Sequence, residues 1–158
     1  MGDLPLTDLA ALNDYSRDFA AVLFERWPEW RDLAVYNPEE GTLLLEVAPE
    51  TSGRPKIRLY TDDDEVTVEF DLWHAHYDWA GESREDEWQG ALDLVVDLLA
   101  ERLAVQVWMA GDRWSGSALV EAGDGWLPFP EDWDASDLTR SYRRSFRGTF
   151  GGERSFAP

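Results

Sequence analysis

Both histidines of the chain lie in one short run, Asp-Leu-Trp-His-Ala-His-Tyr-Asp-Trp, over residues 71–79. Successive side chains of a β-strand alternate between its two faces, so a strand here would place His74, His76 and Asp78 on one face. Two imidazoles and a carboxylate at this spacing could bind one metal ion or transfer protons. Metal sites of this kind usually include a more distant histidine, and this chain has no third histidine. The spacing therefore permits a metal-dependent enzyme that uses these three residues but does not require one.

The apolar pattern of the strand that leads into this run inverts near Leu72. Before this point even-numbered positions are apolar and odd-numbered positions are polar, whereas after it the aromatic side chains fall on odd positions and the histidines on even ones. A β-bulge at Leu72 and Trp73 would restore the alternation and leave His74, His76 and Asp78 on an exposed face. With the bulge these are contact residues for a partner; without it they lie at the end of the core.

The elements that would position this run are predicted from periodicity and turn residues. Thr7 can cap a helix whose apolar residues recur at helical spacing, and Pro28 would end it. Strands are expected at residues 33–37, 42–48 and 56–61, and a fourth from residue 65 to residue 72 or beyond. Because the links between these strands are short, neighbouring strands are expected to pair antiparallel in a meander.

A second helix is expected to begin at Ser83 and to lie across one face of the sheet, with an apolar stripe that continues to Leu103. Asp93, Asp97 and Glu101 stand four residues apart on another side of this helix. Like charges at this spacing cost roughly 0.2–0.5 kcal/mol per pair. Two interpretations stay open: the row is a docking ridge for a basic partner, or it is a solvated face of an acidic protein.

The last third of the chain predicts further strands. Residues 105–109 and 117–121 are expected to form a hairpin, and residues 141–150 an edge strand that arginines keep soluble. The expected fold class is α+β: an antiparallel sheet, made of a meander of about four strands, the later hairpin and the edge strand, with two main helices packed on it. We expect residues 1–138 to form a single acidic domain and residues 139–158 an arginine-rich segment that ends in a disordered tail.

Three of the nine tryptophans fall in predicted turns or loops. They are Trp114, Trp126 and Trp133, and Phe129 lies in the same region. Aromatic side chains on loops are typical of protein interfaces and of sugar-binding grooves. Either these loops fold back onto the sheet, or their aromatic side chains form a binding patch.

Charge is unevenly distributed along the chain. The 158 residues carry a net charge of −19. After residue 138 five arginines oppose one glutamate, so this tail is +4 and residues 1–138 carry −23. Such a body repels nucleic acid and anionic membranes, and it would be steered toward a basic protein. The alternative is that the acidity serves only to keep the protein soluble.

The sequence lacks the features of several other protein classes. A hydrophobic content of 44% is too high for a disordered chain, and there is no cysteine for a disulfide or a thiolate site. We find no glycine-rich phosphate loop, no Gly-x-Ser-x-Gly elbow and no helical two-histidine zinc motif. Neither a signal peptide nor a membrane span is predicted. The expectation is a cytoplasmic protein that is not an enzyme and has no cofactor.

Residues 66–79, with the sequence VTVEFDLWHAHYDW, resemble a segment of small bacterial proteins described as immunity proteins of toxin systems. In those proteins a strand ends in a similar pattern of phenylalanine, aromatic residue, His-x-His, aromatic residue and aspartate. The order of helix, meander and helix is also similar. The resemblance implies an α+β inhibitor that binds and neutralises a cognate toxin in the cytoplasm without catalysis. It assigns no role to the histidines.

The leading hypothesis is a non-catalytic protein-binding domain of the immunity type, whose partner is a basic toxin domain. It is expected to bind neither nucleic acid nor membrane directly. Two alternatives stay open, a metal-dependent enzyme and an acidic mimic of nucleic acid. The expected contact surface combines the residues Trp73, His74, His76, Asp78, Asp93, Asp97 and Glu101.

Overall fold

The computed structural model describes residues 2–78, 83–133 and 137–156, and the chain divides into two compact units. The first unit comprises residues 2–48, 56–69 and 74–95, and the second comprises residues 49–55, 70–73 and 96–156. Each unit has its own antiparallel sheet. The fold class is therefore α+β as expected, with two sheets in place of the one sheet that the sequence predicted.

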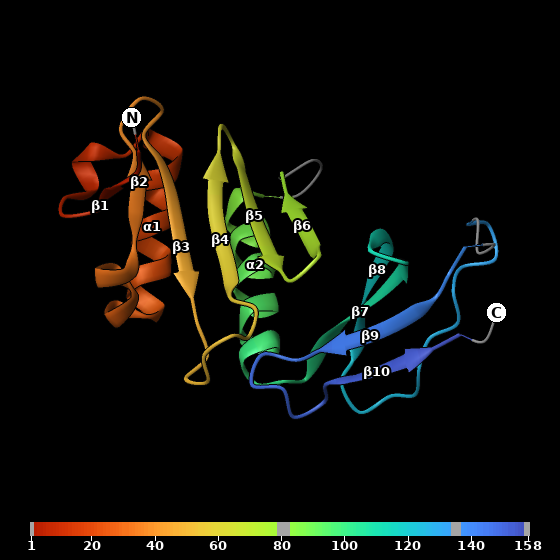
Figure 1. Ribbon diagram of the computed structural model, residues 1–158. Helices are drawn as coiled ribbons and strands as arrows, with labels where there is room; N and C mark the ends of the chain where they lie inside the picture. The colour runs from red at the N-terminus through yellow and green to blue at the C-terminus, as the bar shows by residue number, and fades with distance from the viewer. Residues whose placement is uncertain (1, 79–82, 134–136, 157–158) are drawn as a thin grey trace. The chain divides into compact units, whose positions relative to one another are not determined.

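The sheet of the first unit is a meander, because each strand pairs with its neighbours in the sequence. Figure 1 shows the strands side by side from β1 to β6. The predicted meander is confirmed, and two strands extend it beyond the four expected, one at each edge. The strands are β1 Leu4–Pro5, β2 Val35–Asn37, β3 Thr42–Val47, β4 Ile57–Asp62, β5 Glu65–Phe70 and β6 Trp73–Tyr77.

Helix α1, Asp14–Arg26, begins later than the expected cap at Thr7. The residue that caps it is Asn13, whose side-chain oxygen accepts a hydrogen bond from the backbone N–H of Ser16 over 2.8 Å. An Asn side chain that bonds the third N–H of a helix satisfies one of its unpaired donors. Two short 3-10 helices flank α1, Leu9–Ala11 before it and Pro28–Leu33 after it.

Helix α2, Arg84–Leu99, begins where the sequence predicted, directly after Ser83. Figure 1 shows α1 and α2 on the same side of the first sheet. The indole Nε1 of Trp88 on α2 donates a hydrogen bond of 3.1 Å to the hydroxyl of Tyr15 on α1. One face of this sheet is thus covered by helices, and its strands β3 and β4 alternate between buried and half-buried residues.

The strands β5 and β6 form a hairpin, so the inversion at Leu72 comes from a turn and not from the β-bulge that the sequence allowed. Residues 71 and 72 form a two-residue turn, in which Asp71 has a φ of 53°. Short hairpin loops favour positive φ, which aspartate tolerates better than most residues. A two-residue loop pairs residue 70 with residue 73, so even positions of β5 share a face with odd positions of β6. The pattern inverts because the chain turns back at Leu72.

The second unit contains a four-stranded sheet in the order β10-β9-β7-β8. The predicted hairpin of β7 and β8 is confirmed. The strand expected at residues 141–150 is β9, which ends earlier and lies between β7 and β10, so the edge is formed by β10. The arginine-rich segment therefore belongs to this sheet as far as residue 155, while residues 157–158 lie outside the described residues. The strands are β7 Leu103–Ala110, β8 Arg113–Glu121, β9 Arg140–Arg144 and β10 Gly152–Ser155.

Candidate functional site

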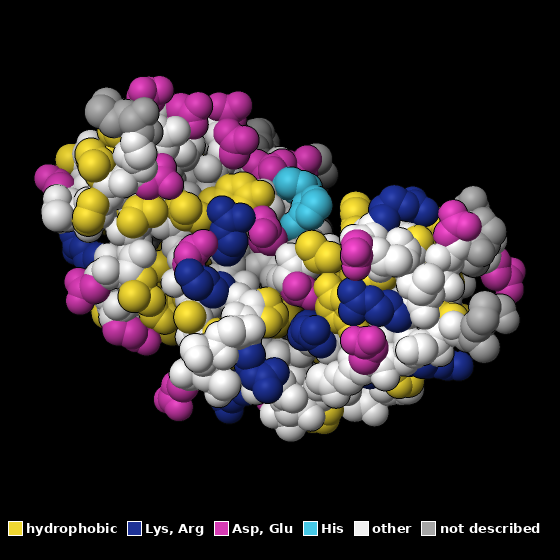
Figure 2. All heavy atoms as spheres, in the orientation of Figure 1, with side chains coloured by type: hydrophobic (Ala, Val, Ile, Leu, Met, Phe, Trp, Pro, Cys, Tyr) yellow, Lys and Arg dark blue, Asp and Glu magenta, His cyan; other side chains and the backbone are white. Residues whose placement is uncertain are grey.

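The strands of the first unit together form one face that α1 and α2 leave uncovered (Figure 1). Its side chains alternate with the buried ones along β3 and β4, whereas on β5 Thr67 of this face is itself buried between Glu65 and Glu69. On β6 the exposed positions are those of the two histidines, which Figure 2 shows in cyan. We call this surface the open face; it comprises Thr42, Leu44, Glu46, Arg58, Tyr60, Glu65, Thr67, Glu69, His74 and His76.

A row of ion pairs crosses the middle of the open face. The Nζ of Lys56 lies 2.7 Å from a carboxylate oxygen of Glu46, and the guanidinium of Arg58 lies 3.3 Å from Glu46 and 3.1 Å from Glu69. These side chains are about 30–50% exposed, and ion pairs with this exposure contribute only about 0–1 kcal/mol to stability. The two glutamates are locally neutralised, so the unbalanced negative charge of this face lies elsewhere.

The two histidines lie together at the β6 edge of the open face. The Nδ1 atom of His76 lies 2.5 Å from Oε1 of Glu65 and 2.9 Å from Oγ1 of Thr67. The ring of His74 meets the ring of His76 edge-on, with 4.9 Å between centroids. The strand pair thus holds His76 in one orientation, with half of its side chain still exposed.

The set Thr67, His76 and Glu65 does not have the geometry of a catalytic triad. In a triad the two ring nitrogens of histidine contact the nucleophile and the orienting carboxylate separately. Here both partners contact the same nitrogen, Nδ1. In addition, Thr67 is 1% exposed, so a substrate cannot reach its hydroxyl. The cluster is suited to presenting an oriented imidazole to a partner.

The residues predicted around this run do not all lie on one surface. His74 and His76 lie on the open face, whereas Trp73 pairs with Phe70 across the turn and shares the face of that buried side chain. Asp78 follows the end of β6 and is exposed. Trp79 lies outside the described residues. Among the described residues no group of three or more His, Cys, Asp or Glu side chains is arranged to hold a metal ion.

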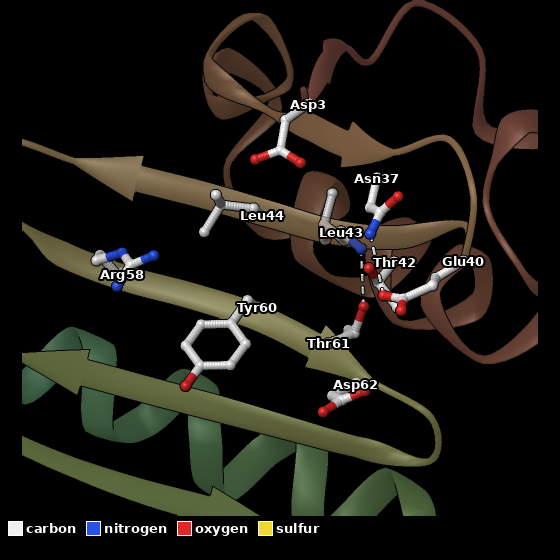
Figure 3. Close-up of a pocket in the computed structure, with 10 residues that line it drawn as sticks. All are labelled: Asp3, Asn37, Glu40, Thr42, Leu43, Leu44, Arg58, Tyr60, Thr61 and Asp62. Carbon is white, nitrogen blue, oxygen red and sulfur yellow. Dashed lines mark hydrogen bonds between the residues drawn. The ribbon is translucent and has the colours of Figure 1, made fainter. Parts of the chain in front are cut away.

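A hollow of about 360 Å³ opens at the other end of the open face, over β2, β3 and β4 (Figure 3). Three carboxylates line it from three separate segments: Asp3 from the N-terminus, Glu40 from the β2–β3 turn and Asp62 from the end of β4. All three are exposed. The other lining residues are Asn37, Thr42, Leu43, Leu44, Arg58, Tyr60 and Thr61.

Hydrogen bonds fix the walls of this hollow. The amide of Asn37 donates to the carboxylate of Glu40 over 3.0 Å. The hydroxyl oxygen of Thr61 accepts from the backbone N–H of Leu43 over 2.9 Å and lies 2.6 Å from the hydroxyl of Ser16. Of the four charged side chains that line the hollow, three are carboxylates, and the fourth, Arg58, is paired with Glu46 and Glu69. A cleft with such an excess of negative charge concentrates cations. The hollow is therefore suited to a cationic group such as a lysine or arginine side chain.

The sequence signal for this hollow is the acidic content of two turns, but acids are also common in turns for local reasons. In a meander, alternate turns lie at the same end of the sheet. The β2–β3 turn and the β4–β5 turn therefore meet at one end, and both are rich in acids: Glu39, Glu40, Asp62, Asp63 and Asp64. A second hollow at this end is lined by Asn13, Asp14, Tyr15, Asp63 and Asp64.

Of the three acids predicted to form a row on the second helix, only Asp93 and Asp97 lie on α2. Asp93 lies on α2 and accepts from Gln89 over 2.7 Å and from Arg26 over 3.3 Å. Asp97 forms an ion pair of 2.6 Å with Arg102. Since α2 ends at Leu99, Glu101 lies beyond the helix, and the predicted row is wrong at this position.

Glu101 is 8% exposed and holds the loop between β9 and β10. Its carboxylate accepts from the hydroxyl of Ser145 over 2.6 Å, from the backbone N–H of Arg147 over 2.8 Å, and from both the N–H and the hydroxyl of Thr149. Burial would raise the pKa of Glu101, but these hydrogen bonds together lower it to about 2. This carboxylate is used inside the second unit and is not presented to a partner.

Comparison with protein-family models, with curated proteins and with solved structures gives no match. Within the described residues no helix has the length and apolar character needed to cross a membrane. The function must therefore be inferred from the surfaces themselves.

Proposed function

We propose that this chain is a non-catalytic binding protein that holds a basic protein partner against the open face. The observation that carries this proposal is the hollow that Asp3, Glu40 and Asp62 line from three segments of the chain. Such a hollow, on a sheet face that helices leave uncovered, is a binding site for a cationic side chain of the partner. The oriented imidazole of His76 lies on the same face and extends the contact area.

The charge of the chain supports a protein partner rather than a nucleic acid. Residues 1–138 carry −23, which repels phosphates and speeds encounter with a basic surface. The finer role that we propose is that of an immunity-type inhibitor, which neutralises a cognate bacterial toxin in the cytoplasm. This role is supported by the resemblance of residues 66–79 and by the negative charge of the chain. Toxins that act on nucleic acid need a basic surface, and an acidic inhibitor would be attracted to it.

The experiment compares two variants that remove the same charge from different surfaces. The test variant D3N/E40Q/D62N neutralises the hollow, and the matched control E25Q/E29Q/D32N neutralises three exposed acids of α1 and the 3-10 helix that follows it. The partner to be tested is the product of any adjacent gene that has the features of a toxin, and the affinity is measured by calorimetry at low salt. We expect the test variant to lose roughly tenfold or more in affinity and the control to lose much less.

Two outcomes would contradict the proposal. If the two unmodified proteins pass through size exclusion separately at low salt, the inhibitor role is wrong. If the test and control variants lose the same affinity, the hollow is not the contact site and only the total charge matters.

A further inference from the structure

Residues 123–133, which we call the strap, cross one face of the sheet in the second unit. They follow β8, and residues 125–130 form neither helix nor strand (Figure 1). The face beneath the strap is defined by strand pairing, which places Gln106 opposite Arg143 and Trp108 opposite Gly116. Gln106, Trp108 and Arg143 are all at least nine-tenths buried.

Side chains of the sheet bind the main chain of the strap. Gln106 accepts from the N–H of Leu127 over 3.0 Å and donates to its C=O over 2.9 Å, so one amide satisfies both backbone groups of one residue. Arg143 donates to the carbonyls of Asp124 and Gly125 over 2.6 Å and 2.7 Å. Contacts to backbone groups do not depend on the side chains of the bound segment. This face therefore holds the strap as a protein holds an extended peptide.

Three aromatic side chains of the strap have separate contacts on the same face. Trp126 lies under the guanidinium of Arg143, 5.2 Å from the ring centroid. Phe129 meets the ring of Trp108 edge-on at 5.7 Å. Trp133 covers Gly116 so closely that a Cβ there would lie 2.0 Å from its ring.

The strap leaves part of this face unsatisfied. The Nε1 of Trp108 and the Nε of Arg143 are buried and have no hydrogen-bond partner among the residues that the structure describes. Buried donors without an acceptor are unfavourable. The strap is also partly exposed, since Leu127 is 41% and Trp133 is 45% exposed. A segment with acceptors at these two donors would complement the face better than the strap does.

We infer that this face is a peptide-binding surface whose resident ligand is the strap, and that an extended segment of a partner protein takes its place. The ligand is a peptide with aromatic residues in a proline-containing stretch, as in the strap sequence Gly-Trp-Leu-Pro-Phe-Pro. This inference goes beyond the proposed function, because it concerns the second unit and needs no basic partner.

The first measurement is amide hydrogen exchange in the unmodified full-length protein. The N–H of Leu127 is bound to a side chain of the sheet, whereas the N–H groups along β7 belong to the strand ladder. If the strap opens independently, Leu127 exchanges at least roughly tenfold faster than Val107 under conditions where the protein stays folded. Equal protection of the two amides would overturn the inference, because the strap would then be a permanent part of the core.

The second measurement uses a labelled peptide with the sequence of residues 122–133 and the full-length protein. We expect W133A, which loses the contact on Gly116, to bind this peptide roughly tenfold more tightly than the unmodified protein, because less of the face is occupied. The double variant Q106A/W133A and a peptide carrying Trp126→Ser and Phe129→Ser should both lose this gain. Failure of folded W133A to bind the peptide, with no exchange of straps into a dimer, would also overturn the inference.

Discussion

The Nδ1 atom of His76 lies 2.5 Å from Oε1 of Glu65, on the strand next to its own. This contact exists because the chain turns back at Asp71 and Leu72. The hairpin brings the glutamate that begins β5 beside the histidine near the end of β6. The pair orients an exposed imidazole on the open face, which is the geometry of a contact residue.

Replacing His76 with alanine should leave the protein almost as stable as before. The side chain is 50% exposed, and a polar contact with this exposure contributes about 0–1 kcal/mol, so we expect the free energy of unfolding to fall by less than about 1 kcal/mol. Urea unfolding measures this change. The free energy of binding to the basic partner should change by more than the free energy of unfolding does. A large loss of stability with unchanged binding would show that His76 serves the fold.

Adding zinc, nickel or manganese should not raise the melting temperature of the protein. A metal that binds the folded state stabilises it by mass action, and the structure brings no suitable group of three side chains together among the described residues. Thermal unfolding with and without each metal, together with elemental analysis of the purified protein, makes the comparison. A metal-dependent rise that disappears in H74A/H76A would support the metal-dependent enzyme instead.

Replacing Glu101 with glutamine should destabilise the second unit at neutral pH. The folded state lowers the pKa of Glu101 from 4.5 to about 2, so this group stabilises the protein above pH 4.5. That contribution is lost as the pH falls from 4.5 to 2, because the unfolded chain takes up the proton first. A pKa shift of this size corresponds to roughly 3 kcal/mol in the free energy of unfolding.

The pH dependence of Glu101→Gln is measured by urea unfolding between about pH 2.5 and pH 7. The variant should lose stability most at pH 7 and approach the unmodified protein in acid. The matched control is Asp97→Asn, since that side chain is 37% exposed and its ion pair contributes about 0–1 kcal/mol. If the variant loses the same stability at every pH, the ionised carboxylate does not have the role described here.

Replacing Gly116 with alanine should displace Trp133 without unfolding the sheet. The new Cβ would lie 2.0 Å from the indole ring, which must move, while the ring is already 45% exposed. The indole N–H resonance of Trp133 should shift and exchange faster with water. Gly123→Ala is the control, because no atom of the described residues lies within 4 Å of a Cβ at that position. An unchanged Trp133 resonance in Gly116→Ala would show that the strap does not lie on Gly116.

The fold was predictable where one local signal decided the structure. Alternating apolar residues and short links predicted the meander, and Ser83 marked the start of α2. The start of α1 was predicted too early, because Thr7 and Asn13 both have side chains that can cap a helix. The inverted pattern at Leu72 does not distinguish a bulge from a two-residue turn, since both change which face a residue occupies.

The candidate site was less predictable, because it depends on segments that are distant in the sequence. Asp3, Glu40 and Asp62 form one hollow only after the meander has folded. Glu101 had the right spacing for an exposed helical row, but whether α2 continued past Leu99 was not decided by the local sequence. The partners of Glu101 lie more than forty residues further along the chain.

The central claim is that a basic partner lies on the open face. Amide hydrogen exchange of the free protein and of its complex with the toxin-like partner tests this most directly. The account predicts slower exchange in the complex along β3, β4 and the β2–β3 turn, with α1 unchanged. Protection confined to α1 or to the strap, with β3 and β4 unaffected, would contradict it.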